Sequence, residues 1–544
     1  MNLILQHLVV LPVVVPLLSA AIMVLLPEER RTARVVLALV SVLIQLLIGA
    51  ALLYLTSDAA PFIWPEGVGV YAIGNWAAPF GIVLVVDRLS AVMVTLGAVI
   101  SIATLVYSIA RWDRPAQPFH SLFQLLTMGL NGAFLTGDLF NLFVFFEVLL
   151  ASSYGLVLRG VGAERVRTGM HYIAVNLTAS LLFLIGVALI YGIAGTLNMA
   201  DLAGRAAALD PSDRALFDAG AAILGVAFLI KAGSWPLNFW LPGAYSVALA
   251  PVAAAFAMMT KVGLYAVLRV GTILQEDETL AAALFYVGLA TLITASIGML
   301  GAKHLARLVS FSLLASMGIL LATFGLRMEA LTGPLMYYMI VSVLTTSAFF
   351  MLTGMTDRTR ITDPPVSKDE APPPRPLYVA FGVRKPADYG IDEEVGIAIP
   401  AAMAFLGLMF VCCVLLVAGL PPLSGFVAKF ALLATALRGA PQSGVPIETW
   451  TLCAAIILSG LAALIALSRI GMRLFWSVAA RATPRLRVLE AAPVAALVLL
   501  CLVLTVAADP VARYLNTAAR SLHQPDTYVH AVLAARSREE ARRP

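Results

Sequence analysis

The sequence predicts an all-α polytopic membrane protein, and three observations support this prediction. Of the 544 residues, 61% are hydrophobic and 12% are charged, with a mean hydropathy of +0.93, whereas soluble proteins carry about 25% charged residues. The apolar residues come in blocks of about 18 or more, long enough for a helix to cross a bilayer. The alternation typical of a membrane β-barrel is absent. These observations exclude a soluble enzyme, a disordered protein and a secreted disulfide scaffold.

About fourteen apolar segments are long enough to be transmembrane helices. The first can span the membrane, so we expect no cleaved signal peptide. The seventh is broken at Pro236, and the twelfth is too long for one straight crossing and is broken at Gly419, Pro421 and Pro422. The predicted segments are 3–26, 35–56, 87–110, 119–136, 138–158, 168–194, 216–239, 246–270, 280–300, 304–325, 331–353, 397–437, 450–476 and 490–508.

The basic residues orient these segments. Counted with the helix ends beside them, the odd-numbered loops carry 21 Lys and Arg and the even-numbered loops carry 5. The positive-inside rule therefore places the odd loops in the cytoplasm and both termini outside. The basic C-terminal tail, with Arg536, Arg538, Arg542 and Arg543, is in tension with this orientation, but it lies far from the last segment.

Net charge and cysteines exclude other classes of partner. The net charge of +5 does not indicate nucleic acid, because the basic residues are spread over loops and form no patch. The four cysteines lie in apolar stretches without a Cys-x-x-Cys or Cys/His spacing, so we expect neither disulfides nor a metal centre. They are Cys412, Cys413, Cys453 and Cys501.

The loop at 354–396 is the one long linker, and it is rich in proline and mixed charge. Such a composition is typical of a flexible connector. A cytoplasmic docking segment is the alternative interpretation.

Three lysines and one glutamate are the charged residues that stand out inside the apolar segments. Three of the six lysines, Lys231, Lys261 and Lys429, are among them. Glu147 lies nine residues after Asp138, about 13 Å along a helix and near the middle of the hydrocarbon layer. Each such charge costs about 2.5–3.5 kcal/mol to insert. A proton-transfer site is therefore favoured over the alternatives, which are a structural ion pair or a lysine that extends to the membrane surface.

Of the two strongly basic residues, lysine suits proton transfer and arginine does not. Burial favours the neutral form of a lysine, and a nearby carboxylate favours its charged form, so a Glu/Lys pair can hold or release a proton. Arginine does not deprotonate. The thirty arginines lie almost entirely in loops, whereas half of the lysines lie in membrane segments.

The two broken segments resemble each other. Gly233-Ser-Trp-Pro236 and Gly419-Leu-Pro-Pro422 are 186 residues apart, measured between Pro236 and Pro422. They fall five segments apart, and an odd offset means opposite topology. This pattern predicts an inverted repeat with broken helices at its interface, as in many transporters. A proline kink that serves packing alone is the alternative.

Four stretches together resemble the antiporter-like proton-conducting subunits shared by Mrp-type cation/proton antiporters and respiratory complex I. They read DLFNLFVFFE at 138–147, KAGSWPL at 231–237, KVGLY at 261–265 and GLPPLSGFVAKF at 419–430. The resemblance extends from about residue 80 to residue 480. The stretches 137–155 and 469–476 are most similar to the D subunit of the Mrp (also called Mnh or Pha) antiporters.

The resemblance implies fourteen helices with two inverted five-helix repeats in a bacterial inner membrane. It implies a proton relay from Glu147 and Lys231 through Lys261 to Lys429, and exchange of external protons for cytoplasmic Na⁺ or K⁺. Other membrane subunits are required partners, and no cofactor is expected in this chain. The implied regions are an N-terminal three-helix segment (1–115), a first repeat (116–271), a second repeat that contains the linker (272–476), and a last helix with its tail (477–544).

The chain departs from the family between Lys261 and Lys429. Many family members have a histidine where this chain has Ser316, and many have His and Lys on the eleventh helix, where this chain offers hydroxyls. The path would then depend on water, although the same hydroxyls could serve helix packing. The candidate water-holding residues are Ser312, Ser316, Ser342, Thr345 and Thr346. Lys303 and His304 are expected at the membrane interface and outside the relay.

Two other functions remain open from the sequence. The chain could be a proton-pumping subunit of a complex I-like or hydrogenase-type redox complex, in which case iron–sulfur or flavin proteins would accompany it. It could also be a scaffold whose relay no longer conducts, given the missing basic residues of the eleventh helix. A channel is disfavoured because no filter motif is present.

Overall fold

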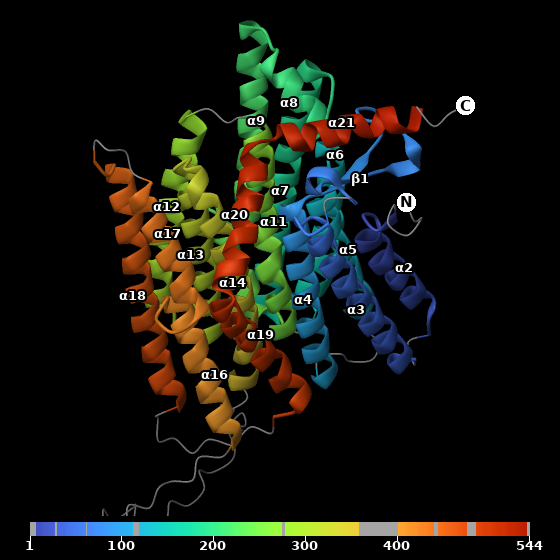
Figure 1. Ribbon diagram of the computed structural model, residues 1–544. Coiled ribbons are helices and arrows are strands. Elements are labelled where there is room, and N and C mark those ends of the chain that lie inside the picture. Colours follow the sequence, from blue (N-terminus) through green and yellow to red (C-terminus); the bar gives the residue numbers. More distant parts are fainter. Residues whose placement is uncertain are drawn as a thin grey trace, which may run out of the picture.

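The chain forms a bundle of long helices that run between two ends (Figure 1). The computed structural model describes residues 7–27, 30–60, 63–111, 119–159, 162–274, 278–357, 401–439, 444–475 and 486–540. Within these ranges, twelve helices are long and apolar enough to cross a membrane. The prediction of a helical, multi-pass membrane protein is confirmed, while the count of fourteen crossings stays a prediction.

Every predicted segment contains a helix. Two helices, α2 (Leu11–Leu25) and α5 (Phe119–Leu135), are shorter than the twelve. The seventh predicted segment, 216–239, contains most of α9 (Pro211–Ala232) and the break after it, and α10 (Trp240–Val247) begins one residue beyond its predicted end. The twelfth is divided into α16 (Ala401–Ala418) and α17 (Ser424–Arg438). The remaining segments are α3 (Arg31–Leu55), α4 (Arg88–Arg111), α6 (Leu139–Val157), α7 (Ala163–Ala194), α11 (Ala250–Leu274), α12 (Glu278–Gly301), α13 (Leu305–Gly325), α14 (Glu329–Thr356), α18 (Ile447–Phe475) and α19 (Val488–Val506).

A short hairpin lies at one end of the bundle. Strands β1 (Gly69–Ala72) and β2 (Val83–Val86) pair antiparallel with Gly69 opposite Val86. Two 3₁₀ turns, Pro65–Gly67 and Ile73–Asn75, flank β1, and the short helix α8 (Met199–Ala207) lies at the same end (Figure 1). The sequence does not predict this hairpin, because Val83–Val86 is a short apolar run directly before a long one.

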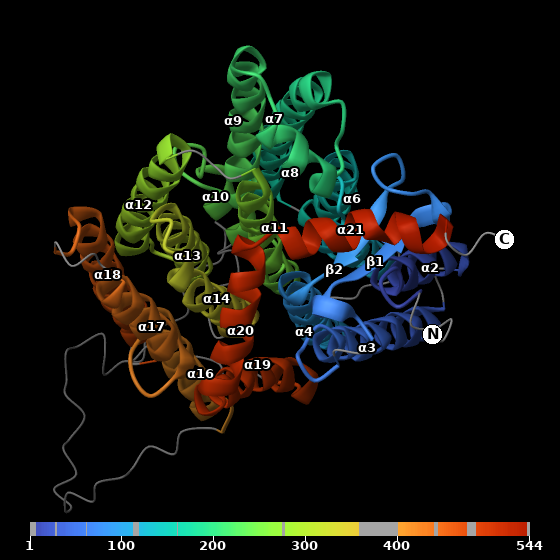
Figure 2. The same ribbon diagram turned by 45° about the horizontal axis from the view of Figure 1, so that its top comes forward.

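The predicted C-terminal tail folds into two helices. Helix α20 (Ala508–His523) packs on α14 and buries Leu515, Ala518 and Leu522. Helix α21 (Asp526–Glu540) packs on α8 and β1 and lies across the end of the bundle (Figure 2). The tail therefore helps to build that end.

The first and last described stretches of the chain lie at the end that carries the hairpin. The His7 imidazole lies 3.3 Å from the Tyr71 hydroxyl of β1, and α21 packs on the same strand. The start of the described chain and α21 are thus on the same side of the bundle (Figure 2). The predicted linker 354–396 lies outside the described residues, apart from 354–357 at the end of α14.

Small residues let α12 and α13 approach closely. A Cβ added to Gly288 would lie 2.3 Å from Ala322 N, and one added to Gly318 would lie 2.5 Å from Leu292 N. Close backbone approach at small residues is a main source of helix association in membranes. This contact joins two helices that are consecutive in the chain.

A ladder of buried amides docks α2 and α3 on α5. Asn131 Nδ2 donates to the Pro12 carbonyl at 2.8 Å and to Gln45 Oε1 at 3.0 Å. The Pro12 carbonyl needs this partner because Pro16, four residues later, has no N–H to offer. Ser41 Oγ extends the ladder by donating to Gln124 Oε1 at 2.9 Å.

Candidate functional site

Glu147 lies in the middle of α6. The helix begins with Asp138 as its N-cap, whose carboxylate accepts the Asn141 N–H at 2.8 Å. Phe140 and Val144 on the same stripe are 47% and 39% exposed, so this stripe faces away from the core of the chain. The Glu147 side chain is 32% exposed. Its carboxylate therefore lies where the packed interior meets the outward face.

Lys231 meets Glu147 from the last turn of α9. The Lys231 side chain is 3% exposed, and its Nζ lies 3.8 Å from Glu147 Oε1. Ser180 of α7 lies beside both: its hydroxyl donates to Glu147 Oε1 and accepts from Lys231 Nζ at 3.1 Å. The Phe146 ring centroid lies 4.9 Å from the same Nζ. The structure thus brings together the two charges that the sequence pairs.

The break after α9 positions Lys231. Gly233 adopts the left-handed conformation (φ 74) that ends the helix, and its N–H donates to the Ile230 carbonyl at 3.0 Å. Such a C-terminal glycine satisfies carbonyls that would otherwise lack partners. Pro236 lies in the non-helical stretch before α10, as predicted.

Lys261 is fully buried on α11, at 0% exposure. Its Nζ donates to Ser316 Oγ at 2.9 Å and contacts Met317 Sδ at 3.0 Å. Both partners lie on α13. Among the described residues, no hydrogen bond or ion pair joins Lys261 to Lys231, so the structure does not bring these two lysines into contact.

Lys429 lies on α17, beyond the second break. Its Nζ donates to the Val417 and Ala418 carbonyls at 2.8 and 3.1 Å, which are the last carbonyls of α16. The C-terminal end of a helix carries partial negative charge that stabilises a cation. Gly419, at φ 78, is required here, because a Cβ would lie 2.5 Å from Lys429 Cδ. Pro421 and Pro422 follow in the stretch between the helices.

One cavity adjoins Lys429 and contains all five predicted hydroxyl residues in its lining. Its volume is about 30 Å³, which is large enough to hold water. Four of the hydroxyls donate to carbonyls of their own helices, and each keeps lone pairs that can accept from water. The polar residues in this lining include Ser312, Ser316, Ser342, Thr345, Thr346 and Lys429.

None of the three buried ammonium groups extends to an end of the bundle. Lys231, Lys261 and Lys429 are 5%, 0% and 7% exposed, and their contacts are with neighbouring helices. By contrast, Lys303 and His304 are exposed at the turn between α12 and α13.

Ser180 is a residue of the site that was not predicted from the sequence. One signal could have indicated it: Tyr172, Asn176 and Ser180 recur every fourth residue on α7, which places three polar groups on one helix face. All three are buried. Inserting a helix into the membrane costs little extra free energy when it contains one serine, so a single serine does not by itself indicate a functional site.

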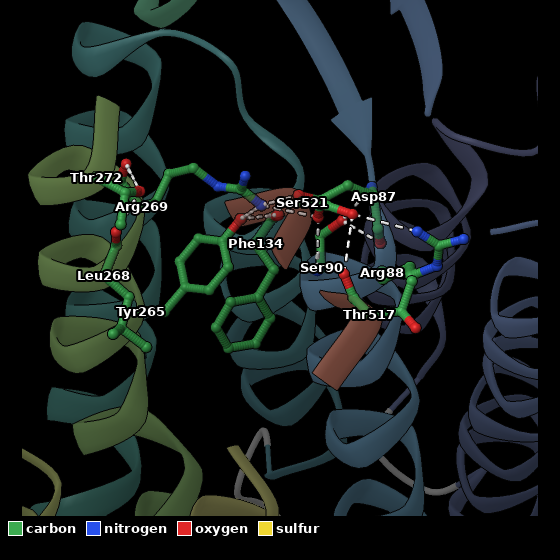
Figure 3. A network of polar contacts seen from close by, with 10 residues as sticks. All are labelled: Asp87, Arg88, Ser90, Phe134, Tyr265, Leu268, Arg269, Thr272, Thr517 and Ser521. Atoms are coloured by element: carbon green, nitrogen blue, oxygen red, sulfur yellow. Dashed lines mark hydrogen bonds and ion pairs between the residues drawn. The ribbon is translucent and has the colours of Figure 1, made fainter. Parts of the chain in front are cut away.

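A second charged cluster lies towards the hairpin end (Figure 3). Asp87, just before α4, forms a 2.7 Å ion pair with Arg269 of α11. Burial tends to raise the pKa of Asp87, but the Arg269 guanidinium and hydrogen bonds from Ser90 outweigh burial and hold that pKa below its usual value. Tyr265, one turn from Arg269, donates to the Phe134 carbonyl at 2.7 Å. This cluster fixes the far end of the helix that carries Lys261.

Comparisons with known proteins match the chain to one described family and to relatives over its full length. The family described as NADH:quinone oxidoreductase/Mrp antiporter, TM, matches residues 136–364. A relative from Rhizobium meliloti, described as the D subunit of a probable K⁺/H⁺ antiporter, is 46% identical over 98% of this chain and 98% of its own length. A relative from Bacillus subtilis, described as the D subunit of a Na⁺/H⁺ antiporter, is 31% identical over 97% of this chain and 99% of its own length.

Solved structures show the same fold. A chain of the Mrp complex from Dietzia sp. aligns with a TM-score of 0.80 at 25% identity, covering 98% of this chain and 100% of that one. A chain of an archaeal membrane-bound sulfane sulfur reductase aligns with a TM-score of 0.78 at 22% identity, covering 98% and 100%, which shows the fold alone. On the full-length relatives above, this chain belongs to the family of antiporter D subunits.

Proposed function

We propose that this chain is the proton-translocating subunit of a multisubunit antiporter that exchanges external protons for cytoplasmic Na⁺ or K⁺. Relatives over its full length are named as subunits of K⁺/H⁺ and Na⁺/H⁺ antiporters. The observation that carries the proposal is the meeting of Glu147 and Lys231 at Ser180 between membrane-spanning helices. The protein is a transporter subunit, and its partners are other membrane subunits.

The chemistry of the Glu147–Lys231 pair suits proton transfer. An ammonium in a low-dielectric site releases its proton more readily than one in water, and a carboxylate beside it opposes that release. When Glu147 is ionised, Lys231 holds its proton. When Glu147 becomes neutral, the attraction is lost and Lys231 releases the proton more easily.

The relay continues through Lys261 and Lys429. Lys261 donates to Ser316 Oγ, and Ser316 and Lys429 line the same cavity. Water in that cavity would connect the two lysines by accepting from Ser316 or Lys429 and donating to the other hydroxyls. The hydroxyls of α13 and α14 thus replace the basic side chains that many family members have there.

The orientation follows from the charge pattern. We place the hairpin end and both termini outside the cell and the linker 354–396 inside, because the odd-numbered loops carry most of the basic residues. We also propose that α5–α11 and α12–α18 form two inverted repeats, since a glycine in the left-handed conformation ends both α9 and α16.

The proposal is tested by exchange measurements on the whole complex. Inverted membrane vesicles that contain all subunits are energised, and cation-dependent proton movement is followed with a pH-sensitive dye. Glu147→Gln and Lys231→Ala are each expected to abolish exchange while the other subunits still copurify.

Matched controls separate the relay from general damage. Lys303→Ala and Glu164→Gln change exposed residues of the same types and should leave exchange unchanged. Exchange at the wild-type rate in the Glu147 or Lys231 variant would refute the relay. Iron–sulfur or flavin proteins in the purified complex would identify a redox pump instead.

A further inference from the structure

The Ser180 hydroxyl occupies the gap between the two charged groups of the first pair. Lys231 Nζ and Glu147 Oε1 are 3.8 Å apart, longer than the 2.7–3.2 Å, roughly, of a hydrogen bond. Ser180 Oγ is within hydrogen-bond distance of both. The shortest connection between the acid and the base therefore passes through this hydroxyl.

We infer that Ser180 carries the proton between Lys231 and Glu147, and this inference rests on the proposed function. A transfer requires no other reactant. Lys231 gives an N–H proton to Ser180 Oγ while the Ser180 O–H proton passes to Glu147 Oε1. One N–H bond and one O–H bond break, two O–H bonds form, and serine is unchanged at the end.

A second acceptor lets the hydroxyl work in both states of Glu147. Ser180 Oγ also lies 3.0 Å from the Asn176 carbonyl, one turn earlier on α7. When Glu147 is protonated and donates to Ser180, the serine proton can turn to this carbonyl. When Glu147 is ionised, the proton points to its carboxylate. A hydroxyl with one proton and two acceptors is thus a two-position switch.

The surroundings leave Lys231 few other acceptors. Its Nζ lies over the Phe146 ring, which stabilises a cation but cannot take its proton. Ser180 is 5% exposed and the Lys231 side chain is 3% exposed, and the Phe146 ring also packs against Phe183 and Phe228. Because Lys231 and Ser180 are nearly inaccessible to solvent, the Ser180 hydroxyl is the acceptor that the protein itself provides.

The test compares Ser180→Ala, Ser180→Thr and Thr178→Ala in the complete complex, in the same vesicle assay across pH 6 to 9. Thr178 is the matched control, because it lies on the exposed face of α7 and its hydroxyl donates to the Ala174 carbonyl of its own helix. We expect Ser180→Ala to lower exchange by about tenfold or more, as the loss of one hydrogen bond to a charged group implies. Its pH profile should also shift. Ser180→Thr, which keeps the hydroxyl, should restore both, and Thr178→Ala should match the wild type.

Two outcomes would overturn the inference, and both differ from failure of the proposed function. If Glu147→Gln and Lys231→Ala abolish exchange but Ser180→Ala exchanges at the wild-type rate and pH profile, the relay stands without Ser180. If Ser180→Ala and Ser180→Thr lose exchange equally in an assembled complex, the hydroxyl is not the determinant. If Glu147→Gln and Lys231→Ala are themselves active, the proposed function fails first.

Discussion

Lys261 is held at the centre of the bundle by a single hydroxyl. Its side chain is wholly buried, and Ser316 Oγ is the oxygen that accepts from its ammonium at 2.9 Å. The same hydroxyl lines the cavity that contains Lys429. Ser316 therefore both stabilises one lysine and connects it to the space beside the next.

Ser316→Ala is expected to lower exchange by about tenfold, because a hydrogen bond to a charged group contributes about 1.5–3 kcal/mol. Ser310→Ala is the matched control on the same helix: that hydroxyl is equally buried and donates to the Ala306 carbonyl at 2.9 Å. Initial exchange rates in vesicles check the prediction. An equal loss in both variants would show that serines of α13 act through packing alone.

The charged residues of the site could be predicted from the sequence because a charge in an apolar helix raises the free energy of membrane insertion. Glu147, Lys231, Lys261 and Lys429 stand out for this reason. Ser180 does not stand out, because a serine hydroxyl can form a hydrogen bond to a carbonyl of its own helix and therefore adds little to the free energy of membrane insertion. Arg269 was missed for another reason: it lies near a helix end, where a basic residue also fits a loop boundary.

At the level of elements, α12 and α13 pack with their backbones in close contact. Gly318 and Gly288 face each other's helices across backbone atoms that leave no room for a Cβ. The pair therefore depends on the absence of side chains. This contact holds α13, and with it Ser316, against its neighbour.

Gly318→Ala should destabilise the protein by about 1–3 kcal/mol, since an extra methyl in a packed interface forces the backbones apart. Gly225→Ala is the control, because a Cβ there meets no described atom within 4 Å, and it should be neutral or slightly stabilising. Thermal unfolding of the detergent-purified complex, followed by fluorescence, measures both. A wild-type melting temperature for Gly318→Ala would contradict the contact.

Some elements are predictable from composition and others are not. The breaks in the seventh and twelfth segments follow from glycine and proline, whose backbone restrictions are local. The hairpin is not predictable, because β1 and β2 are four residues each and their pairing is a tertiary event. Helix α20 is also not predicted from composition. Its buried residues lie on one face only, so the average hydropathy of the segment stays low.

At the scale of the whole molecule, the end with the hairpin is tied together by contacts between distant parts of the chain. Asp87 pairs with Arg269, and the Arg269 guanidinium also lies 5.1 Å from the Tyr528 ring of α21. Nearby, Arg88 donates to Ser521 of α20 at 3.2 Å (Figure 3). The charge pattern predicts that both termini share one side. The charge pattern does not predict that α21 of the C-terminal tail packs against the Asp87–Arg269 ion pair, because this packing depends on side-chain contacts between distant segments.

Asp87→Asn is expected to destabilise the protein by about 3–5 kcal/mol, because it leaves the Arg269 guanidinium buried without a carboxylate. The double variant Asp87→Asn/Arg269→Gln should recover part of this loss. Asp58→Asn is the control: Asp58 also pairs with an arginine, at 2.5 Å, but its side chain is 83% exposed, so the cost should stay below about 1 kcal/mol. Equal melting temperatures for Asp87→Asn and Asp58→Asn would contradict the assignment.

The same ion pair predicts a pH dependence. The pKa of Asp87 is lower in the folded protein than its ordinary value of 3.8, so its contribution is complete above that value and is lost as the pH falls through the folded pKa. Acidification from neutral pH into this range should therefore lower the melting temperature of the wild type more than that of Asp87→Asn.

The cavity between α13, α14 and α17 has one further consequence. Among the described residues that line it, Lys429 is the only one with an amine or imidazole, so a proton that crossed the cavity would pass over hydroxyls and water. Under the proposed relay, loss of water from this cavity would interrupt proton transfer between Lys261 and Lys429. A small inward movement of the side chains that line the cavity would then be enough to stop this transfer.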